Sequence, residues 1–157
     1  MTIRIQKQDF DAGYEIKRLC AKNTNIGGVC SFIGLVRETQ SGSTIKAMTL
    51  EHYAGMTEKQ LVKIEEEALD RWPLEESLII HRYGRMVPSE QIVLVVTASA
   101  HRKAAFESCE FLIDWLKTKA PFWKNEETLK GKEWVQAKIP VVLQTANKGI
   151  QRTNCPP

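Results

Sequence analysis

The chain has 157 residues, 43% hydrophobic and 26% charged, which is typical of a soluble globular protein long enough to bury a core. Its net charge of +3 is too small to indicate nucleic-acid binding, and no apolar run approaches the roughly 18 residues of a membrane-spanning helix. The start, MTIRIQKQDF, lacks the apolar centre of a secretory signal, so we expect a cytoplasmic protein.

The first elements predicted are a short strand and a helix. Alternating isoleucines at positions 3 and 5 predict the strand. Either Asp9 or Asp11 can cap the helix that follows and runs to about Cys20. That helix would bury Ile16 and Leu19, and the segment NTNIGG then forms a turn.

A nearly unbroken apolar run, Gly28 to Val36, predicts a central strand. Arg37 follows it and begins a polar connection. Alternation from Thr44 to Tyr53 then predicts the returning strand of a hairpin.

The clearest helical pattern runs from Met56 to Trp72, with apolar residues recurring along one face. Thr57 and Gln60 have the spacing of a capping box, S/T-x-x-E/Q, which places the helix start there. Pro73 ends the pattern.

Two further strands, SLIIHRYG and EQIVLVVTASA, are separated by a turn and followed by a helix from about Ala100 to Thr118. The residues that this helix is expected to bury are Phe106, Cys109, Leu112, Ile113 and Leu116. After a bend at Pro121, EWVQAKI predicts the last strand.

The predicted order is β-α-β-β-α-β-β-α-β. Adjacent strands without an intervening helix favour antiparallel pairing, so the sequence predicts an α+β fold with about three helices and a mostly antiparallel sheet. Residues 1–139 are expected to form a single catalytic domain, and residues 140–157 a loosely held polar tail.

The cysteines do not indicate a disulfide framework or a metal site. The four of them, Cys20, Cys30, Cys109 and Cys155, are scattered singly with no C-x-x-C pair. Cys30 and Cys109 lie in apolar patterns and are expected to be buried as small hydrophobic residues. The three histidines also lack metal-ligand spacing, so we expect no metal.

Two cationic positions stand at the ends of predicted elements. Arg37 directly follows the apolar strand, where it is either a binding group or a solvated charge. His101 and Arg102 stand where a strand gives way to a helix, whose free N–H groups and dipole favour a phosphate or a carboxylate. The alternative there is a surface charge beside a capping histidine.

A third cationic position is the stretch LKTKAPFWKNE, in which Pro121 separates Lys117 from Lys124. The proline ends the helix, so Lys117 belongs to its last turn and Lys124 to the returning arm of a bend. Such a bend can aim both ammonium groups at one point, with Phe122 and Trp123 excluding water and favouring a neutral amine. Glu126 could instead pair with one lysine and keep it charged. The other alternative is a solvated helix end whose lysines complement the helix dipole.

Six short motifs occur in one order along the chain. They are F-x-G-L-V-R at 32–37, L-E-H-Y at 50–53, G-M-T-E at 55–58, I-H-R-x-G at 80–84, A-H-R at 100–102 and L-K-T-x-A-P-F-W-K at 116–124. Over roughly residues 3–137 the chain therefore resembles the large, catalytic subunit of molybdopterin synthase.

The resemblance implies a sulfurtransferase with an α/β-hammerhead fold and no cofactor of its own. It would build the dithiolene of molybdopterin on cyclic pyranopterin monophosphate (precursor Z). Sulfur would arrive as a thiocarboxylate on the C-terminal Gly-Gly tail of a small ubiquitin-like partner subunit. The implied assembly is a heterotetramer, in which a central homodimer of large subunits carries one small subunit at each end.

The resemblance also implies a set of site residues. Those expected around the substrate are Leu35, Val36, Arg37, His101, Arg102, Lys117, Lys124, Asn125 and Glu126. Lys117, where the partner's tail would enter, and Lys124 are the implied catalytic residues, and we expect them to stabilise developing negative charge and to relay a proton. Lys138 stands where many relatives carry arginine, so its contact with substrate stays open.

One function from another class remains as an alternative. A non-catalytic module that binds a ubiquitin-like partner or a phosphorylated small molecule would need the basic pocket but not both lysines and the bend. Nucleic-acid binding would require a broad basic face, whereas acidic residues are interspersed throughout this chain.

Overall fold

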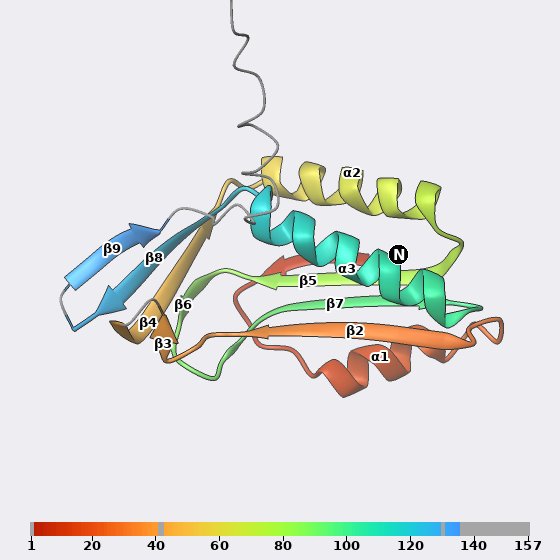
Figure 1. The fold of residues 1–157 in the computed structure, drawn as a ribbon, viewed down its shortest axis with the longest axis horizontal. Coiled ribbons are helices and arrows are strands. Elements are labelled where there is room, and N and C mark those ends of the chain that lie inside the picture. Colours follow the sequence, from red (N-terminus) through yellow and green to blue (C-terminus); the bar gives the residue numbers. More distant parts are fainter. Residues whose placement is uncertain (1, 41–42, 130, 136–157) are drawn as a thin grey trace, which may run out of the picture.

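The computed structural model describes residues 2–40, 43–129 and 131–135, which form three helices and nine strands (Figure 1). The helices are α1 (Ala12–Cys20), α2 (Met56–Arg71) and α3 (Arg102–Thr118). The strands are β1 (Thr2–Gln6), β2 (Gly28–Leu35), β3 (Thr39–Gln40), β4 (Ser43–His52), β5 (Leu74–Arg82), β6 (Gly84–Met86), β7 (Gln91–Ser99), β8 (Phe122–Thr128) and β9 (Gly131–Val135). The predicted α+β class is confirmed.

The strands form two sheets. The first has the order β1-β5-β7-β2, and the second has the order β3-β4-β8-β9, with β6 paired to β4. The pairing of β1 with β5 is parallel and every other pairing is antiparallel, which confirms the mostly antiparallel prediction. The second sheet adjoins one end of the first (Figure 1).

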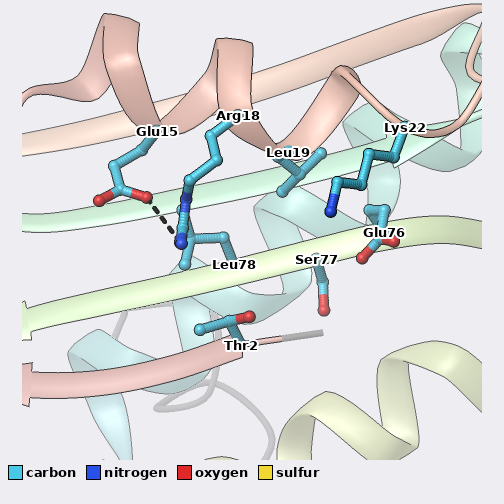
Figure 2. Close-up of a pocket in the computed structure, with 8 residues that line it drawn as sticks. All are labelled: Thr2, Glu15, Arg18, Leu19, Lys22, Glu76, Ser77 and Leu78. Carbon is cyan, nitrogen blue, oxygen red and sulfur yellow. Dashed lines mark ion pairs between the residues drawn. The ribbon is translucent and has the colours of Figure 1, made fainter.

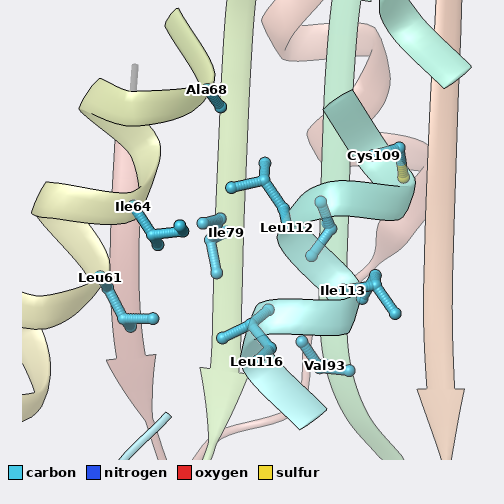
Figure 3. Packing of buried hydrophobic residues seen from close by; sticks show 10 residues of the cluster. Leu61, Ile64, Ala68, Ile79, Val93, Cys109, Leu112, Ile113 and Leu116 are labelled. Atoms are coloured by element: carbon cyan, nitrogen blue, oxygen red, sulfur yellow. The ribbon is translucent and has the colours of Figure 1, made fainter. Parts of the chain in front are cut away.

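The helices cover the first sheet on both faces. Helices α2 and α3 bury one face, where Leu61, Ile79 and Leu112 are completely inaccessible to solvent (Figure 3). Helix α1 covers the other face, where Ile16 and Leu19 pack near the buried strand residues, as predicted. Each fully buried leucine or isoleucine contributes roughly 2 kcal/mol through apolar surface removed from water, so this packing fixes the helices firmly.

Strand β2 differs from its prediction in two ways. It is an edge strand, not a central one, and it pairs with β7 instead of returning to β4 as a hairpin. Its side chains alternate: Cys30 and Phe32 pack toward α3, whereas Ile33 and Leu35 are 40% and 50% exposed. An apolar run has no period, so it cannot distinguish a central strand from an edge strand with an apolar outer row.

The predicted capping box of α2 is wrong by two residues. The residue that caps the helix is Gly55, whose φ of 81° suits glycine, and its N–H donates to the Glu58 carboxylate over 2.6 Å. Thr57 lies inside the helix and donates its hydroxyl to the Tyr53 carbonyl over 3.0 Å. At α1, the two possible caps are resolved in favour of Asp11, which accepts from the Tyr14 N–H over 2.9 Å.

The end of the chain brings two more corrections. Phe106 was expected in the core but is 60% exposed, because it lies one turn from the exposed Lys103 and Glu110 on the solvent side of α3. Strand β8 was not predicted, because its sequence FWKNEET is largely polar. Lys138, Cys155, the end of the predicted last strand and the 140–157 tail lie outside the described residues.

The described residues contain neither a membrane-spanning helix nor a metal-binding cluster. None of their helices is long and apolar enough to cross a bilayer. Their histidines, cysteines and carboxylates form no group that could hold a metal ion.

One carboxyl group lies on the buried side of α2. Glu65 is 8% exposed and accepts a hydrogen bond from the Ser77 hydroxyl of β5. Burial raises the pKa of Glu65 above its ordinary value of 4.5, although the Ser77 hydrogen bond opposes that shift. With the pKa raised in the folded state, the stabilising contribution is complete below pH 4.5 and is lost as the pH rises through the folded value.

We therefore expect Glu65→Gln to raise the free energy of unfolding at pH 7 by about 1 kcal/mol, since the amide keeps an acceptor for Ser77 without a buried charge. The gain should shrink toward pH 4. Urea denaturation between pH 4 and pH 8 measures it, with the exposed Asp70→Asn as control. A gain that is independent of pH would contradict the explanation.

Candidate functional site

The start of α3 presents two exposed side chains, His101 and Arg102, which we call the arginine end. His101 has extended backbone angles and its side chain does not cap the helix, so within the described chain it leaves the first N–H groups uncapped. This geometry is compatible with the predicted anion site. It does not by itself select a phosphate over a carboxylate.

A glycine pair fixes the backbone at this end. The Gly27 N–H donates to the Ser99 carbonyl over 3.1 Å, and a Cβ at Gly27 would lie 2.3 Å from the Ala100 carbonyl oxygen. A Cβ at Gly28 would lie 3.4 Å from the Cα of Arg102. The segment NTNIGG is therefore the turn that lets the beginning of β2 pack against the beginning of α3.

Lys117 stands at the other end of α3. Its Nζ lies 5.1 Å from the ring centroid of Phe32 in β2, a cation–π arrangement on a side chain that is otherwise exposed. The N–H groups of Lys119 and Ala120 both donate to the Trp115 carbonyl, over 2.8 Å and 3.2 Å, and close the helix. Pro121 then leads directly into β8, so the predicted bend is present.

Lys124 and Glu126 lie on one face of β8 and form an ion pair. Cross-strand pairing places Lys124 opposite Leu50, and Glu126 opposite Met48. The side chains of Lys124 and Glu126 are 26% and 9% exposed. Glu126 Oε1 is the atom that faces the Lys124 ammonium group. A carboxylate this buried depends on its ammonium partner.

The end of β2 approaches the same region through Val36. This residue is 4% exposed and belongs to a small apolar cluster with Met48, Leu50 and Met86. Its N–H donates to the Glu90 carbonyl over 2.9 Å and its carbonyl accepts from the Ser89 N–H over 2.8 Å. The N–H and the carbonyl of Val36, which was expected near the substrate, thus both make hydrogen bonds within the fold.

The remaining predicted residues are distributed differently. Leu35, the last residue of β2, and Arg37, two residues further on, are both exposed. Asn125 alternates with Lys124 along β8 and so faces the opposite side of the second sheet. Lys117, with its neighbour Phe32, and Lys124, with its neighbour Glu126, stand on either side of the bend at Pro121, and we call these four residues the lysine end.

One chain does not bring the two ends together. Arg102 and Lys117 are the first and the last-but-one residues of α3, and at 1.5 Å per residue their backbones lie roughly 22 Å apart. The prediction that the arginine and lysine groups share one pocket is therefore not met within a single copy.

Sequence reasoning missed the aromatic surroundings of Lys124. His81 of β5 stacks on Phe122 with ring centroids 3.8 Å apart and an interplanar angle of 14°. Burial lowers the pKa of His81 to about 4, so the ring is neutral at pH 7. His52 lies 6.0 Å from Phe122 and 4.6 Å from Tyr83, centroid to centroid. The motifs I-H-R and L-E-H-Y hold both histidines, but their spacing indicated no contact.

A separate cavity of about 310 Å³ lies under α1 and contains none of the predicted site residues (Figure 2). Its buried Glu15 contacts Arg4 over 2.6 Å and Arg18 over 3.0 Å. Burial alone would raise the pKa of Glu15, but the two guanidinium groups outweigh it and hold the pKa below its ordinary value. The charge of Glu15 is offset by these two guanidinium groups, and we assign the cavity no ligand.

Comparisons with known proteins cover most of the chain. The model of the family described as "MoaE protein" matches residues 5–119. A relative from Ralstonia nicotianae named "Molybdopterin synthase catalytic subunit" is 50% identical over 153 residues, which are 98% of this chain and 87% of the relative. The solved structure of a molybdopterin biosynthesis MoaE protein from Burkholderia ambifaria superposes with a TM-score of 0.78 at 49% identity, covering 96% of this chain and 99% of that one.

A more distant structure comes from Helicobacter pylori, where it is described as a complex of subunits 1 and 2 of molybdopterin-converting factor. It superposes with a TM-score of 0.71 at 24% identity, over 87% of this chain and 91% of that one. At this identity the likeness concerns the fold alone.

The glycine turn yields a test of the arginine end. Because the obstacle to a Cβ at Gly27 is backbone, Gly27→Ala must displace residues 100–102, and we expect it to lower the free energy of unfolding by about 1–3 kcal/mol. Hydrogen exchange should accelerate in the first turn of α3 and stay unchanged around Lys117. The control is Gly13→Ala in α1, where a Cβ meets only the Asp11 side chain. Unchanged exchange in the first turn would show that the contact is not needed.

Proposed function

The chain belongs to the MoaE protein family, and we propose that it is the catalytic subunit of a molybdopterin synthase that transfers sulfur to cyclic pyranopterin monophosphate. The family's role in molybdenum-cofactor biosynthesis is given by the names of its members. The sulfur donor in this proposal is the C-terminal thiocarboxylate of a small ubiquitin-like subunit. The Helicobacter pylori complex of two subunits is compatible with such a partner.

A single observation carries the proposal. The bend at Pro121 brings Lys117, from a helix, and Lys124, from a strand, to the same end of α3. Lys124 faces the buried Glu126, and Lys117 stands exposed above the Phe32 ring. One ammonium group is thus held in place by a carboxylate, and the other is accessible to an incoming chain terminus.

The two lysines would act differently on the reactants. Transfer of sulfur from a thiocarboxylate to a pterin carbon builds negative charge on the carbonyl oxygen and on the oxygens of the substrate. Ammonium groups fixed beforehand stabilise that charge without reorganising during the reaction. Lys117, which the described structure does not tie to a carboxylate, is the better placed of the two to relay a proton.

The phosphate would be held by a second copy of the chain. Strand β2 is an edge strand with an exposed apolar row, and within the described residues its outer edge pairs with no other strand. If two copies pair antiparallel along β2, Gly28 of one copy lies opposite Leu35 of the other. Since Gly28 adjoins Arg102, the arginine end of each copy then meets the lysine end of its partner. A homodimer of this kind completes two equivalent sites.

We expect Lys117→Ala to abolish dithiolene formation while leaving the fold and partner binding nearly intact, because the side chain is exposed and its loss removes only the cation–π contact with Phe32. The assay combines the variant with thiocarboxylated partner and precursor Z, and measures molybdopterin as its fluorescent oxidation product. Lys119→Ala, an exposed lysine two residues away, is the matched control. Near-normal turnover by Lys117→Ala would refute the assignment and favour a non-catalytic binding module.

The shared site makes a separate prediction. Lys117→Ala and Arg102→Ala should each be inactive alone, and an equal mixture of re-assorted dimers should recover about a quarter of wild-type activity. Half of those dimers are mixed, and one of the two sites in each mixed dimer carries no substitution. Co-expression with two different affinity tags isolates the mixed dimer. No recovery in that dimer would contradict the sharing of sites.

A further inference from the structure

The separation of the two lysines depends on how the two sheets are joined. Lys117 belongs to α3, which is packed on the first sheet through Leu112 and Leu116. Lys124 belongs to β8, which pairs with β4 and β9 of the second sheet. Because the two lysines belong to different layers, their relative position depends on the contacts between those layers.

The His81–Phe122 stack is such a contact. His81 lies near the end of β5 on the face that carries α2 and α3, two residues beyond Ile79. Phe122 is the first residue of β8. The two rings are 3.8 Å apart and nearly parallel, and His81 is 7% exposed. A side chain of the first sheet therefore meets β8 at the point where this strand begins.

Other contacts hold the same two rings in place. His81 Nδ1 lies 2.9 Å from the Arg82 carbonyl oxygen, which fixes the orientation of the imidazole. His52 stands opposite Phe122 in the β4–β8 register, and its ring lies beside Tyr83. A second tie to the start of β8, from the Thr57 hydroxyl to the Pro121 carbonyl, is long at 3.5 Å. Of these contacts, the ring stack is the one that joins a strand of the first sheet directly to β8.

We propose that His81 is a positioning residue that sets the place of Lys124 relative to Lys117 by stacking on Phe122. Phe122 and Lys124 are two residues apart and share one face of β8, so their Cα atoms are roughly 7 Å apart. A tilt of β8 at Phe122 is therefore passed to the Lys124 ammonium group. The proposal rests on the proposed function, because it concerns the same pair of lysines.

Two variants separate stacking from space filling. His81→Phe keeps an aromatic ring in the stack, whereas His81→Leu fills the buried site without a ring. A displacement of about 1 Å can cost up to 100-fold in rate, so we expect His81→Leu to lower the single-turnover rate of dithiolene formation by roughly 10- to 100-fold. KM for precursor Z should change little. His81→Phe should stay within about threefold of wild type, since the ring remains.

A matched control removes an aromatic contact elsewhere. Phe111 of α3 lies 5.2 Å from Trp72, centroid to centroid, in a tilted arrangement away from Lys124. Phe111→Ala should lower stability in urea and leave the turnover rate unchanged. If His81→Leu turns over at the wild-type rate, or if His81→Phe is as slow as His81→Leu, the positioning role is overturned.

A second readout does not require the enzyme to be active. Competitive acetylation followed by mass spectrometry gives the reactivity of the Lys124 amine, with the exposed Lys119 in the same chain as internal reference. We expect His81→Leu to change the Lys124 rate several-fold and His81→Phe to leave it unchanged. Equal Lys124 reactivity in all three proteins would overturn the proposal. If the wild-type complex forms no dithiolene, the proposed function fails while this labelling result still judges the role of His81.

Discussion

The packing of α3 on the first sheet is the constraint on which the rest of the structure depends. Leu112 and Leu116 lie in the core formed with α2, β5 and β7, so the helix cannot slide or rotate without opening that core. Both groups of candidate residues are attached to the ends of this helix. The glycine turn fixes one end against β2, and Pro121 turns the other end into β8. The core thus determines where the arginine end and the lysine end lie, and the distance between them.

The buried ionisable groups show a division between stability and chemistry. Glu65 is buried beside a single hydroxyl group, and burial raises the pKa of its carboxyl, which costs stability at neutral pH. Glu126 is equally buried but faces Lys124, so its charge is matched by an ammonium group. Polar groups inside a fold are tolerated where another requirement keeps them. At Glu126 the requirement we infer is a fixed Lys124, held from one side by the carboxylate and from the other by the strand that His81 anchors.

The sequence predicted the three helices, the antiparallel pair β5–β7 and the α+β class, because long apolar periods and breaker residues are local signals. Three features were not predicted, each for a physical reason. Because its outer row is apolar, β2 was predicted to be a central strand although it is an edge strand. Because the stretch KNEET is polar, β8 was not predicted to be a strand. Phe106 followed the apolar pattern of α3 but lies on its solvent side. Of the candidate site, the bend at Pro121 and the separation of Arg102 from Lys117 along one helix were predictable, whereas the stacking of His81 on Phe122 was not, because it joins strands that are distant in the sequence.

The parallel pairing of β1 with β5 affects how the chain can fold while it is being synthesised on the ribosome. Residues 2–6 pair with residues 78–82, and the beginning of β2 pairs with residues near the end of β7. At about 5–20 residues per second of synthesis, the first strand waits several seconds for its neighbour. During that interval the apolar run of β2 emerges before β7, the strand with which it pairs, has been made. If translation stops before residue 99, the released polypeptide cannot complete the first sheet.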